Sequence, residues 1–445
     1  MRKRLAVALV LAAALSLSLS PSLSAAFQRS DVRVHTLANG LKVLLVEDHN
    51  IPNVALYTYF RVGSRNERPG LTGVSHFIEH MMFNGTPAIG PGEFDRRMEF
   101  AGGRNNAFTS DDMTGYTDWF PAAALEEMIQ MEADRIQGLA FVPEVFESER
   151  GVVASERRMA VENNNDAILS ENVRATAIMA HPYHWAVIGW MSDILSWRRD
   201  EVLAYYKTYY APNNAVLIVV GDFDPSAALT LIRKYFGPVP ASPPPPPVST
   251  VEPPQQGLKT VLVRKEAQTP SFQAVWHAPS VKDSDFLPLD ILARPLLEGE
   301  SSRLYRRLVR EEQLAIRVGG GAQATIDPFL FTIDVKPRPG ADLDAIDRVI
   351  EEELAKIKAE GITPAEYEKA MNIIRSDFYQ GLQTIAGRAG RLGWAEILYG
   401  DFGKVFTLMD DYAAVKVERV REVAQKYFQE NNKTIGKLIP EGGAK

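Results

Sequence analysis

The sequence contains no cysteine among its 445 residues. A chain without cysteine forms no disulfide and offers no thiol for the attachment of a lipid. Cysteine ligands for a metal ion are also excluded, so a zinc site in this protein must be built from histidine and carboxylate side chains. Histidine is scarce as well, with seven residues in the chain. A metal site therefore has few places in which to form.

An excess of positive charge is also lacking. The chain has 49 Lys and Arg against 56 Asp and Glu, a formal net charge of −7. Residues 1–26 contain three of the cations and no acidic residue, so the chain beyond them has a net charge of −10. Such a balance does not favour the phosphates of nucleic acid, which bind to cationic surfaces. We therefore expect no nucleic-acid partner.

Long apolar runs are confined to the N-terminus. The basic start Arg2–Arg4 precedes an apolar stretch over 5–19, and residues 24–26 (Ser-Ala-Ala) offer the small side chains of a cleavage site. This pattern predicts a secretory signal peptide over 1–26, cleaved after Ala26. An uncleaved membrane anchor is the alternative, because the run approaches the length that spans a bilayer. No later stretch is comparably apolar, so cleavage would leave no stable membrane anchor.

A proline-rich segment divides the rest of the chain. Residues 238–254 include an unbroken row of prolines over 243–247, and consecutive prolines favour an extended polyproline spacer. The chain beyond residue 26 also exceeds the usual size of a single domain. We therefore predict two domains, over 27–237 and 255–445, joined by a linker at 238–254.

Apolar alternation and periodicity predict the same order of elements in both parts. The first part begins with a hairpin at Asn39-Gly40, the strongest short-range signal for that turn. Amphipathic helices follow, and a continuous apolar run indicates a last, buried strand. Strands are expected at 31–38, 41–47, 54–62 and 215–221, and the clearest helices at 122–136 and 142–164. The sequence thus predicts an α+β fold with two similar domains, each an antiparallel sheet with helices packed mainly on one side.

His76 and His80 are four residues apart, with Glu79 between them. On a helix these three side chains share one face. The neighbouring residues are apolar, and a buried face with two imidazoles and a carboxylate is costly unless something satisfies it. Zinc fits, because it takes neutral imidazoles, and hydrolysis needs a base beside a water molecule. The pattern predicts a catalytic zinc site, with a packed pair of core histidines as the alternative.

A catalytic zinc ion needs a third protein ligand. The helix predicted over 142–164 offers five candidates: Glu144, Glu147, Glu149, Glu156 and Glu162. Glu149 and Glu156 are about two turns apart, so both can face the same way. Spacing does not choose between them, and a solvated charged helix face is the alternative.

Six segments carry a family resemblance: 63–67, 73–86, 102–109, 149–156, 211–214 and 219–222. They resemble the pitrilysin/insulinase family of zinc peptidases, in which His-x-x-Glu-His is the inverzincin signature. The likeness is greatest to the mitochondrial processing peptidase group, with its shorter two-domain subunits. It extends over nearly all of the chain after residue 26 and is fainter in the second half, where 301–305 is the best match. The resemblance implies two domains that form half of a clam-shell.

The resemblance also implies roles for single residues. The family's third zinc ligand is a glutamate about 76 residues after the second histidine, which corresponds to Glu156, and Glu149 matches an acidic residue that supports the site from nearby. Glu79 is implied as the general base that takes a proton from the attacking water. Asn106 and Ala107 match an edge-strand segment that pairs with the substrate backbone. The expected reaction is zinc-dependent endoproteolysis of peptides or unfolded segments.

One departure from the family concerns substrate binding. Complete family enzymes carry an Arg and a Tyr in the domain that faces the zinc site, but the comparable stretch 327–334 contains neither. Arg338 lies between two prolines and is a poor substitute. We therefore expect a homologous partner subunit without the zinc motif to supply the pair in a heterodimer. The export signal predicts a periplasmic location for this assembly.

Two other functions are compatible with parts of this pattern. The first is a non-catalytic structural or chaperone-like subunit, although such relatives usually lose the His-x-x-Glu-His residues. The second is zinc storage, which would not need Glu79. His181 and His184 flank Pro182, which breaks helical spacing, so we expect them to pack in a loop and not to form a second metal site.

Overall fold

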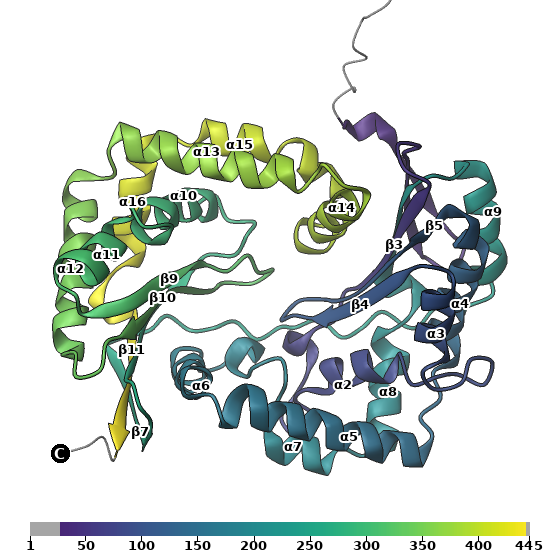
Figure 1. Cartoon of the computed structure of the whole chain (residues 1–445), viewed down its shortest axis with the longest axis horizontal. Coiled ribbons are helices and arrows are strands. Elements are labelled where there is room, and N and C mark those ends of the chain that lie inside the picture. The colour runs from purple at the N-terminus through teal and green to yellow at the C-terminus, as the bar shows by residue number, and fades with distance from the viewer. Residues whose placement is uncertain (1–26, 442–445) are drawn as a thin grey trace, which may run out of the picture.

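The computed structural model describes residues 27–441, and the predicted signal peptide lies outside them. Two sheets stand on opposite sides of a central space, and helices enclose them (Figure 1). The first sheet belongs to the N-terminal half of the chain and the second to the C-terminal half. Residues 241–258 contain no helix or strand and connect the two.

The N-terminal sheet has six strands in the order β1-β2-β6-β3-β5-β4. They are β1 (Val32–Thr36), β2 (Lys42–Glu47), β3 (Asn53–Phe60), β4 (Arg104–Thr109), β5 (Thr114–Pro121) and β6 (Ala215–Gly221). β1 and β2 form the predicted antiparallel hairpin, with Gly40 at a φ of 86° in its turn. β2 and β6 pair in parallel, so the sheet is mixed and not purely antiparallel as predicted. The long helical connection that precedes β6 allows this pairing, because parallel neighbours require a crossover.

Helices of the same half cover one face of this sheet. They are α2 (Val74–Met81), α3 (Glu93–Phe100), α4 (Leu125–Gly138), α5 (Pro143–Arg157), α7 (Met191–Ser196), α8 (Arg199–Tyr209) and α9 (Pro225–Phe236). Their apolar sides form one core with alternate residues of the strands, for example Phe77 of α2 with Leu56 and Phe60 of β3. A π-helical segment at Arg158–Glu162 extends α5, so the helix predicted at 142–164 is present with a change of pitch.

The C-terminal sheet repeats the arrangement with five strands in the order β7-β11-β8-β10-β9. They are β7 (Lys259–Glu266), β8 (Ser271–Ala278), β9 (Ala315–Ala322), β10 (Phe329–Pro337) and β11 (Lys433–Glu441). β7 and β11 are parallel and the other pairs antiparallel. Its helices include α10 (Phe286–Leu297), α12 (Leu343–Glu360), α13 (Pro364–Gln380), α15 (Leu408–Ala414) and α16 (Val417–Tyr427). Apart from β1, the strand connections match those of the first sheet, which confirms two similar α+β domains.

The second face of each sheet is covered by a helix from the other half of the chain. Helix α6 (Asn165–Ala177) packs on β7, β8 and β11, and α14 (Ile385–Tyr399) packs on β3 and β6. Glycine permits the close approach in both places. A Cβ atom at Gly393 would lie 2.2 Å from the ring of Tyr59, and one at Gly436 would lie 2.2 Å from Val173. The two domains are therefore joined by an exchange of helices as well as by the chain.

Within residues 27–441, no helix is both long enough and apolar enough to cross a membrane.

Candidate metal centre

Helix α2 places His76, Glu79 and His80 as their spacing predicts. It begins after Gly73, whose φ is 82° and where a Cβ atom would lie 2.4 Å from the carbonyl oxygen of Ile188. Glu67 accepts hydrogen bonds from the backbone N–H groups of Gly73 (2.7 Å) and Ser75 (2.8 Å). These bonds satisfy donors that have no partner within the first turn of a helix. The close approach of Gly73 to Ile188 and the hydrogen bonds to Glu67 together fix where α2 begins and how it is oriented.

His76, His80 and Glu156 converge on one point. One ligand atom from each lies within 4.8 Å of the other two. Oε2 of Glu156, on the last turn of α5, is 3.7 Å from Nε2 of His76 and 3.5 Å from Nε2 of His80. Two helices that are far apart in the sequence therefore bring two nitrogen atoms and one oxygen atom together.

The state of these atoms fits a metal ion. Oε2 of Glu156 is buried and has no hydrogen-bond partner within residues 27–441, which is costly for a carboxylate oxygen unless a cation is beside it. Burial and the neighbouring His80 lower the pKa of His76 to about 3, so this imidazole is neutral, as a metal ligand must be. Two imidazoles and one carboxylate form a donor set that suits catalytic zinc and leaves a position open. The three residues fit zinc.

Glu149 lies behind His80 and orients it. Oε1 of Glu149 is hydrogen-bonded to Nδ1 of His80 at 2.7 Å, and Oε2 accepts a bond from the amide of Asn84 at 2.9 Å. The bond to His80 lowers the pKa of Glu149. Burial opposes a charge on His80, but Glu149 and the other carboxylates nearby raise its pKa. Of the two glutamates that spacing left open, the structure brings Glu156 into the cluster and places Glu149 next to it.

The carboxylate of Glu79 is held beside this cluster. Its Oε2 accepts a hydrogen bond of 2.5 Å from the hydroxyl of Thr109, the last residue of β4. Burial raises the pKa of Glu79, and the bond from Thr109 opposes that rise. The carboxylate is therefore more basic than an exposed glutamate and has a fixed orientation.

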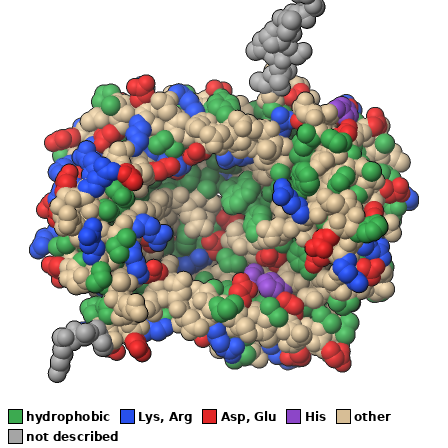
Figure 2. Space-filling view, viewed as in Figure 1, with side chains coloured by type: hydrophobic (Ala, Val, Ile, Leu, Met, Phe, Trp, Pro, Cys, Tyr) green, Lys and Arg blue, Asp and Glu red, His purple; other side chains and the backbone are tan. Residues whose placement is uncertain are grey.

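Asn106 and Ala107 lie in the middle of β4, at the edge of the sheet. β4 pairs with β5, where Asn106 is opposite Thr117 and Ala107 opposite Tyr116. No strand among the described residues pairs with its other edge. Figure 2 shows histidine side chains beside acidic ones at the border of the central hollow of the molecule. An open strand edge thus runs next to the cluster, and such an edge accepts an added strand.

Several residues that hold the centre were not singled out from the sequence. Glu67, Asn84 and Thr109 lie inside or next to the segments that carry the family resemblance, but only the fold shows their contacts. Arg157 directly follows Glu156 and is buried; it donates to the carbonyl of Gly189 (2.5 Å) and to both carboxylate oxygens of Glu171 (2.8 and 3.0 Å). It fixes the end of α5, and with it the position of Glu156.

His181, His184 and Arg338, which the sequence also singled out, make contacts outside the metal cluster. His181 is 3.1 Å from Asp327, and His184 is 2.7 Å from the carbonyl of Ile178. His181 is buried, and His184 is the last residue of a short 3-10 helix, Pro182–His184. Neither belongs to the metal cluster found within residues 27–441. Arg338 donates to the carbonyl of Ala315 at 3.4 Å.

Comparison with known proteins agrees with this geometry. Residues 42–189 match the model described as Insulinase (Peptidase family M16), and residues 196–374 match the Peptidase M16 inactive domain. "Zinc protease PqqE" of Helicobacter pylori is 31% identical over 409 residues, which cover 91% of this chain and 92% of that protein. The crystal structure of a protease from Helicobacter pylori has 30% identity and a TM-score of 0.88, and the match covers 92% of this chain and 99% of that one.

A longer protein shares the fold at lower identity. The periplasmic protease PqqL from Escherichia coli aligns with a TM-score of 0.77 and 20% identity, and the match covers 93% of this chain but 48% of that one. The family models and the relative from Helicobacter pylori cover helix α2, with His76, Glu79 and His80, and residues of both domains. The chain therefore belongs to the insulinase family of peptidases, peptidase family M16.

Proposed function

We propose that this protein is a zinc-dependent endopeptidase that hydrolyses peptides or unfolded segments. The observation that carries the proposal is the convergence of His76, His80 and Glu156 within 4.8 Å, with the raised-pKa carboxylate of Glu79 beside them. A binding site alone would not require that fourth group. The relative named a zinc protease, at 31% identity, supports the same reaction.

His76, His80 and Glu156 would hold the zinc ion. When bound, zinc supplies a Lewis acid that polarises a peptide carbonyl and makes a water molecule more acidic. Glu79 takes the proton from the attacking water and then passes it to the amine of the leaving peptide. Thr109 keeps the carboxylate of Glu79 in place, and Glu149 holds the ring of His80 with Nε2 directed toward Glu156.

The substrate backbone would pair with the open edge of β4 at Asn106 and Ala107. Backbone pairing is independent of side-chain identity, so an extended peptide binds and a folded protein does not. Because Thr109 of the same strand contacts Glu79, a peptide on this edge passes directly in front of the base.

A homologous partner subunit would complete the substrate site. The stretch 327–334 has neither Arg nor Tyr, and Asp327 is engaged with Arg65 and His181 of the first domain. The match with PqqL covers 48% of that longer chain, so PqqL has room in one chain for what a partner would supply here. We place the protein in the periplasm, as for PqqL, on the basis of the basic and apolar start of the sequence.

Replacement of the base tests the reaction. Glu79→Gln should lower peptide hydrolysis by roughly 10²–10⁴-fold, the usual contribution of a general base, while the zinc content measured by atomic emission stays unchanged. A chelator should abolish the activity of the parent protein, and added zinc should restore it. Hydrolysis at the parent rate by Glu79→Gln would sink the assignment.

A non-catalytic subunit is the second candidate. It is favoured by the missing Arg and Tyr and by the match of residues 196–374 to a model described as inactive. This candidate predicts no zinc-dependent hydrolysis with or without a homologous partner, and zinc storage predicts bound zinc without hydrolysis. Hydrolysis with the partner present or absent separates the endopeptidase from both other functions, and the zinc content then tests for storage.

A further inference from the structure

A cavity of about 570 Å³ lies on the C-terminal side of the central hollow, between α10, α14 and the end of β9. Most of its wall is apolar, with Phe286, Ala322, Phe378, Trp394 and Leu408 among the lining residues. Figure 2 shows that apolar side chains line the hollow in this view. A cavity of this size accommodates a small ligand or a few side chains of a peptide.

The cavity is linked to the edge strand β4, which passes Glu79, through Trp394. Side chains alternate along a strand, so Thr109 of β4 faces Glu79 while Phe108 faces the other way. The ring of Phe108 stacks on Trp394 of α14, with centroids 6.2 Å apart and 12° between the planes. Trp394 is 40% exposed and lines the cavity. A peptide paired with β4 would therefore direct alternate side chains toward Glu79 and toward this cavity.

The cavity contains a cation that has no carboxylate partner among the described residues. Arg391 of α14 donates to the backbone carbonyl of Asp377 at 3.1 Å and lies over the ring of Phe378. The other guanidinium in the wall, Arg294, is already paired with Asp290 and Glu298. A half-buried guanidinium among apolar side chains favours a carboxylate, which it binds through two parallel hydrogen bonds.

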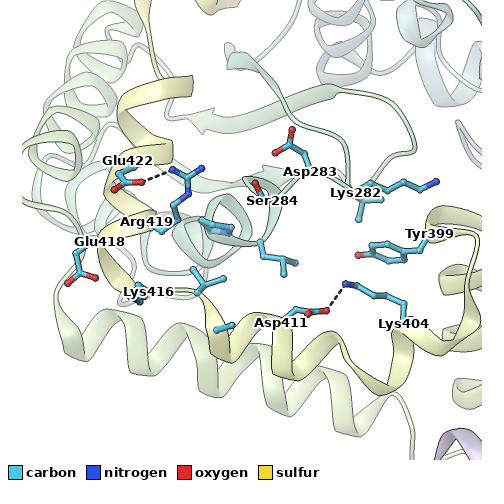
Figure 3. Close-up of a pocket in the computed structure, with 15 residues that line it drawn as sticks. Lys282, Asp283, Ser284, Tyr399, Lys404, Asp411, Lys416, Glu418, Arg419 and Glu422 are labelled. Carbon is cyan, nitrogen blue, oxygen red and sulfur yellow. Dashed lines mark hydrogen bonds and ion pairs between the residues drawn. The ribbon is translucent and has the colours of Figure 1, made fainter.

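A larger neighbouring cavity, of about 760 Å³, has no excess of positive charge in its wall. Figure 3 shows Lys404 paired with Asp411 and Arg419 paired with Glu422 in its wall. Its remaining charged residues, Lys282, Lys416, Asp283 and Glu418, are also balanced in sign. In the larger cavity four acidic residues match four cations in number, whereas the smaller cavity has three cations, Arg294, Arg391 and Lys404, and one acidic residue, Asp290.

Glycine keeps the smaller cavity open. Gly387 and Gly390 of α14 both line it, although a glycine within a helix costs about 1 kcal/mol relative to alanine. Packing explains Gly387, where a Cβ atom would lie 2.1 Å from the carbonyl oxygen of Gly381. Packing does not explain Gly390, because the nearest atom to its Cβ would be the hydroxyl of Tyr59 at 4.0 Å. A larger residue at 390 would instead occupy the cavity.

We propose that this cavity binds a carboxylate and an adjacent apolar side chain of the peptide substrate, with the carboxylate on Arg391 and the apolar group against Trp394. The inference rests on the proposed peptidase function and specifies its substrate class. The carboxylate belongs either to an Asp or Glu side chain or to the C-terminus of the peptide. Acidic peptides are thus preferred, although the chain itself has a negative net charge.

The test measures peptide binding by the Glu79→Gln protein, so that no cleavage interferes. Fluorescent peptides of one length and one apolar sequence carry Glu or Gln at a single position, which is moved along the peptide. Each is made with a free and with an amidated C-terminus. We expect at least one acid-bearing peptide to bind about tenfold tighter than its neutral counterpart. The Glu/Gln and the free/amidated pairs identify which carboxylate is bound.

Variants of the cavity then locate the effect. Arg391→Met should abolish the difference between acidic and neutral peptides, and Gly390→Leu should weaken the binding of the preferred peptide about tenfold or more. Arg375→Met, at an exposed position of α13 outside the cavity, is the matched control and should leave the preference unchanged. Gly390→Ala should fold at least as stably as the parent, which separates filling of the cavity from damage to α14.

Two outcomes would overturn the inference. One is equal binding of acidic and neutral peptides by the Glu79→Gln protein, and the other is a preference that survives in Arg391→Met. If the native protein cleaves neutral peptides but shows no acidic preference, the cavity assignment fails and the peptidase proposal stands. If it binds acidic peptides selectively but cleaves none, with or without a partner, the cavity assignment stands and the peptidase proposal fails.

Discussion

The two domains share one topology, but the residues on their corresponding helices differ in charge and in chemistry. In the N-terminal domain, α2 and α5 bring His76, His80 and Glu156 together. The C-terminal counterparts by order of connection are α10 and α13. On α10, Asp290 and Arg294 are four residues apart, like the two histidines, and Asp377 of α13 lies 4.0 Å from Arg294.

Arg294 thus provides from within the chain the positive charge that the first domain would take from a metal ion. It donates to Glu298 at 2.7 Å and to Asp290 at 3.3 Å, and the hydroxyl of Tyr412 donates to Asp290 at 2.8 Å. Burial opposes the charge on Arg294, but these carboxylates raise its pKa further. The difference shows two ways to balance the acidic groups on corresponding helices. The C-terminal domain uses the side chain of Arg294, and the N-terminal domain would use a bound metal ion.

The largest expected contrast is in catalysis. His80→Ala removes a zinc ligand and should lower hydrolysis by at least about 10³-fold, with loss of bound zinc. Arg294→Met changes the corresponding position in the other domain and should keep the zinc content of the parent. Peptide cleavage and metal analysis of both variants check this. A comparable loss of zinc in Arg294→Met would break the comparison.

The next effect concerns the group behind the ligand. Glu149→Gln keeps a side chain of the same shape but weakens the bond that orients His80, so the dissociation constant for zinc should rise about 10- to 100-fold. A competition titration with a chromophoric chelator measures it. Glu147→Gln, on the same helix but largely exposed, serves as the control and should bind zinc like the parent.

A smaller effect is expected in stability. Arg294→Met leaves Asp290 and its acidic neighbours without their main cation, which costs several kcal/mol at a fully buried site. The side chain of Arg294 is 26% exposed, so solvent screening reduces the expected loss to about 1–2 kcal/mol. Denaturant unfolding of zinc-free protein measures it. His80→Ala should lose less under these conditions, and an equal loss would contradict the assigned role of Arg294.

The smallest effect, taken for one pH unit, is a difference between the two cores in how the free energy of unfolding depends on pH. Asp118 of β5 is buried near Glu132 and Arg135. Both of its carboxylate oxygens are buried and lack a hydrogen-bond donor among the described residues. Burial raises the pKa of Asp118 well above its usual range. The helix-facing positions of β10 in the other domain are instead apolar: Phe331, Ile333 and Val335.

The sign of the effect follows from proton binding. The folded state keeps the proton on Asp118, whereas the unfolded chain releases it above about pH 4. The free energy of unfolding therefore falls as the pH rises from about 4 toward the folded pKa. Asp118→Asn removes this decline, so its stability relative to the parent should rise between pH 5 and pH 8, by at most about 1.4 kcal/mol for each pH unit. Ile333→Val, a control in the other core, should show a difference that does not change with pH.

The parts of the fold that could be predicted are those with local causes. The Asn39-Gly40 hairpin follows from turn chemistry, and the common face of His76 and His80 follows from helical periodicity. Glu149 and Glu156 could not be separated in this way, because both lie on one side of α5 and only the position of α2 distinguishes them. The resemblance to the family implied Glu156, which lies in the cluster.

The exchange of helices between the domains had no local signal. The apolar face of α6 or α14 shows that a helix is covered, but not by which sheet. Helix α14 was also hidden by Gly387, Gly390 and Gly393, which lower intrinsic helix propensity. These glycines are explained by the approach to β3 and by the cavity, and both are properties of the assembled molecule. The parallel pairs β2–β6 and β7–β11 likewise depend on long-range order.

The exchanged helices have a mechanical consequence for the intact molecule. A protease that nicks the exposed proline segment near residues 243–247 would cut the chain without separating its halves, since α6 and α14 each remain seated on the opposite sheet. A half expressed alone would instead carry a helix without its sheet and a sheet without its cover. We therefore expect the nicked protein to remain one folded unit, held together by the two exchanged helices.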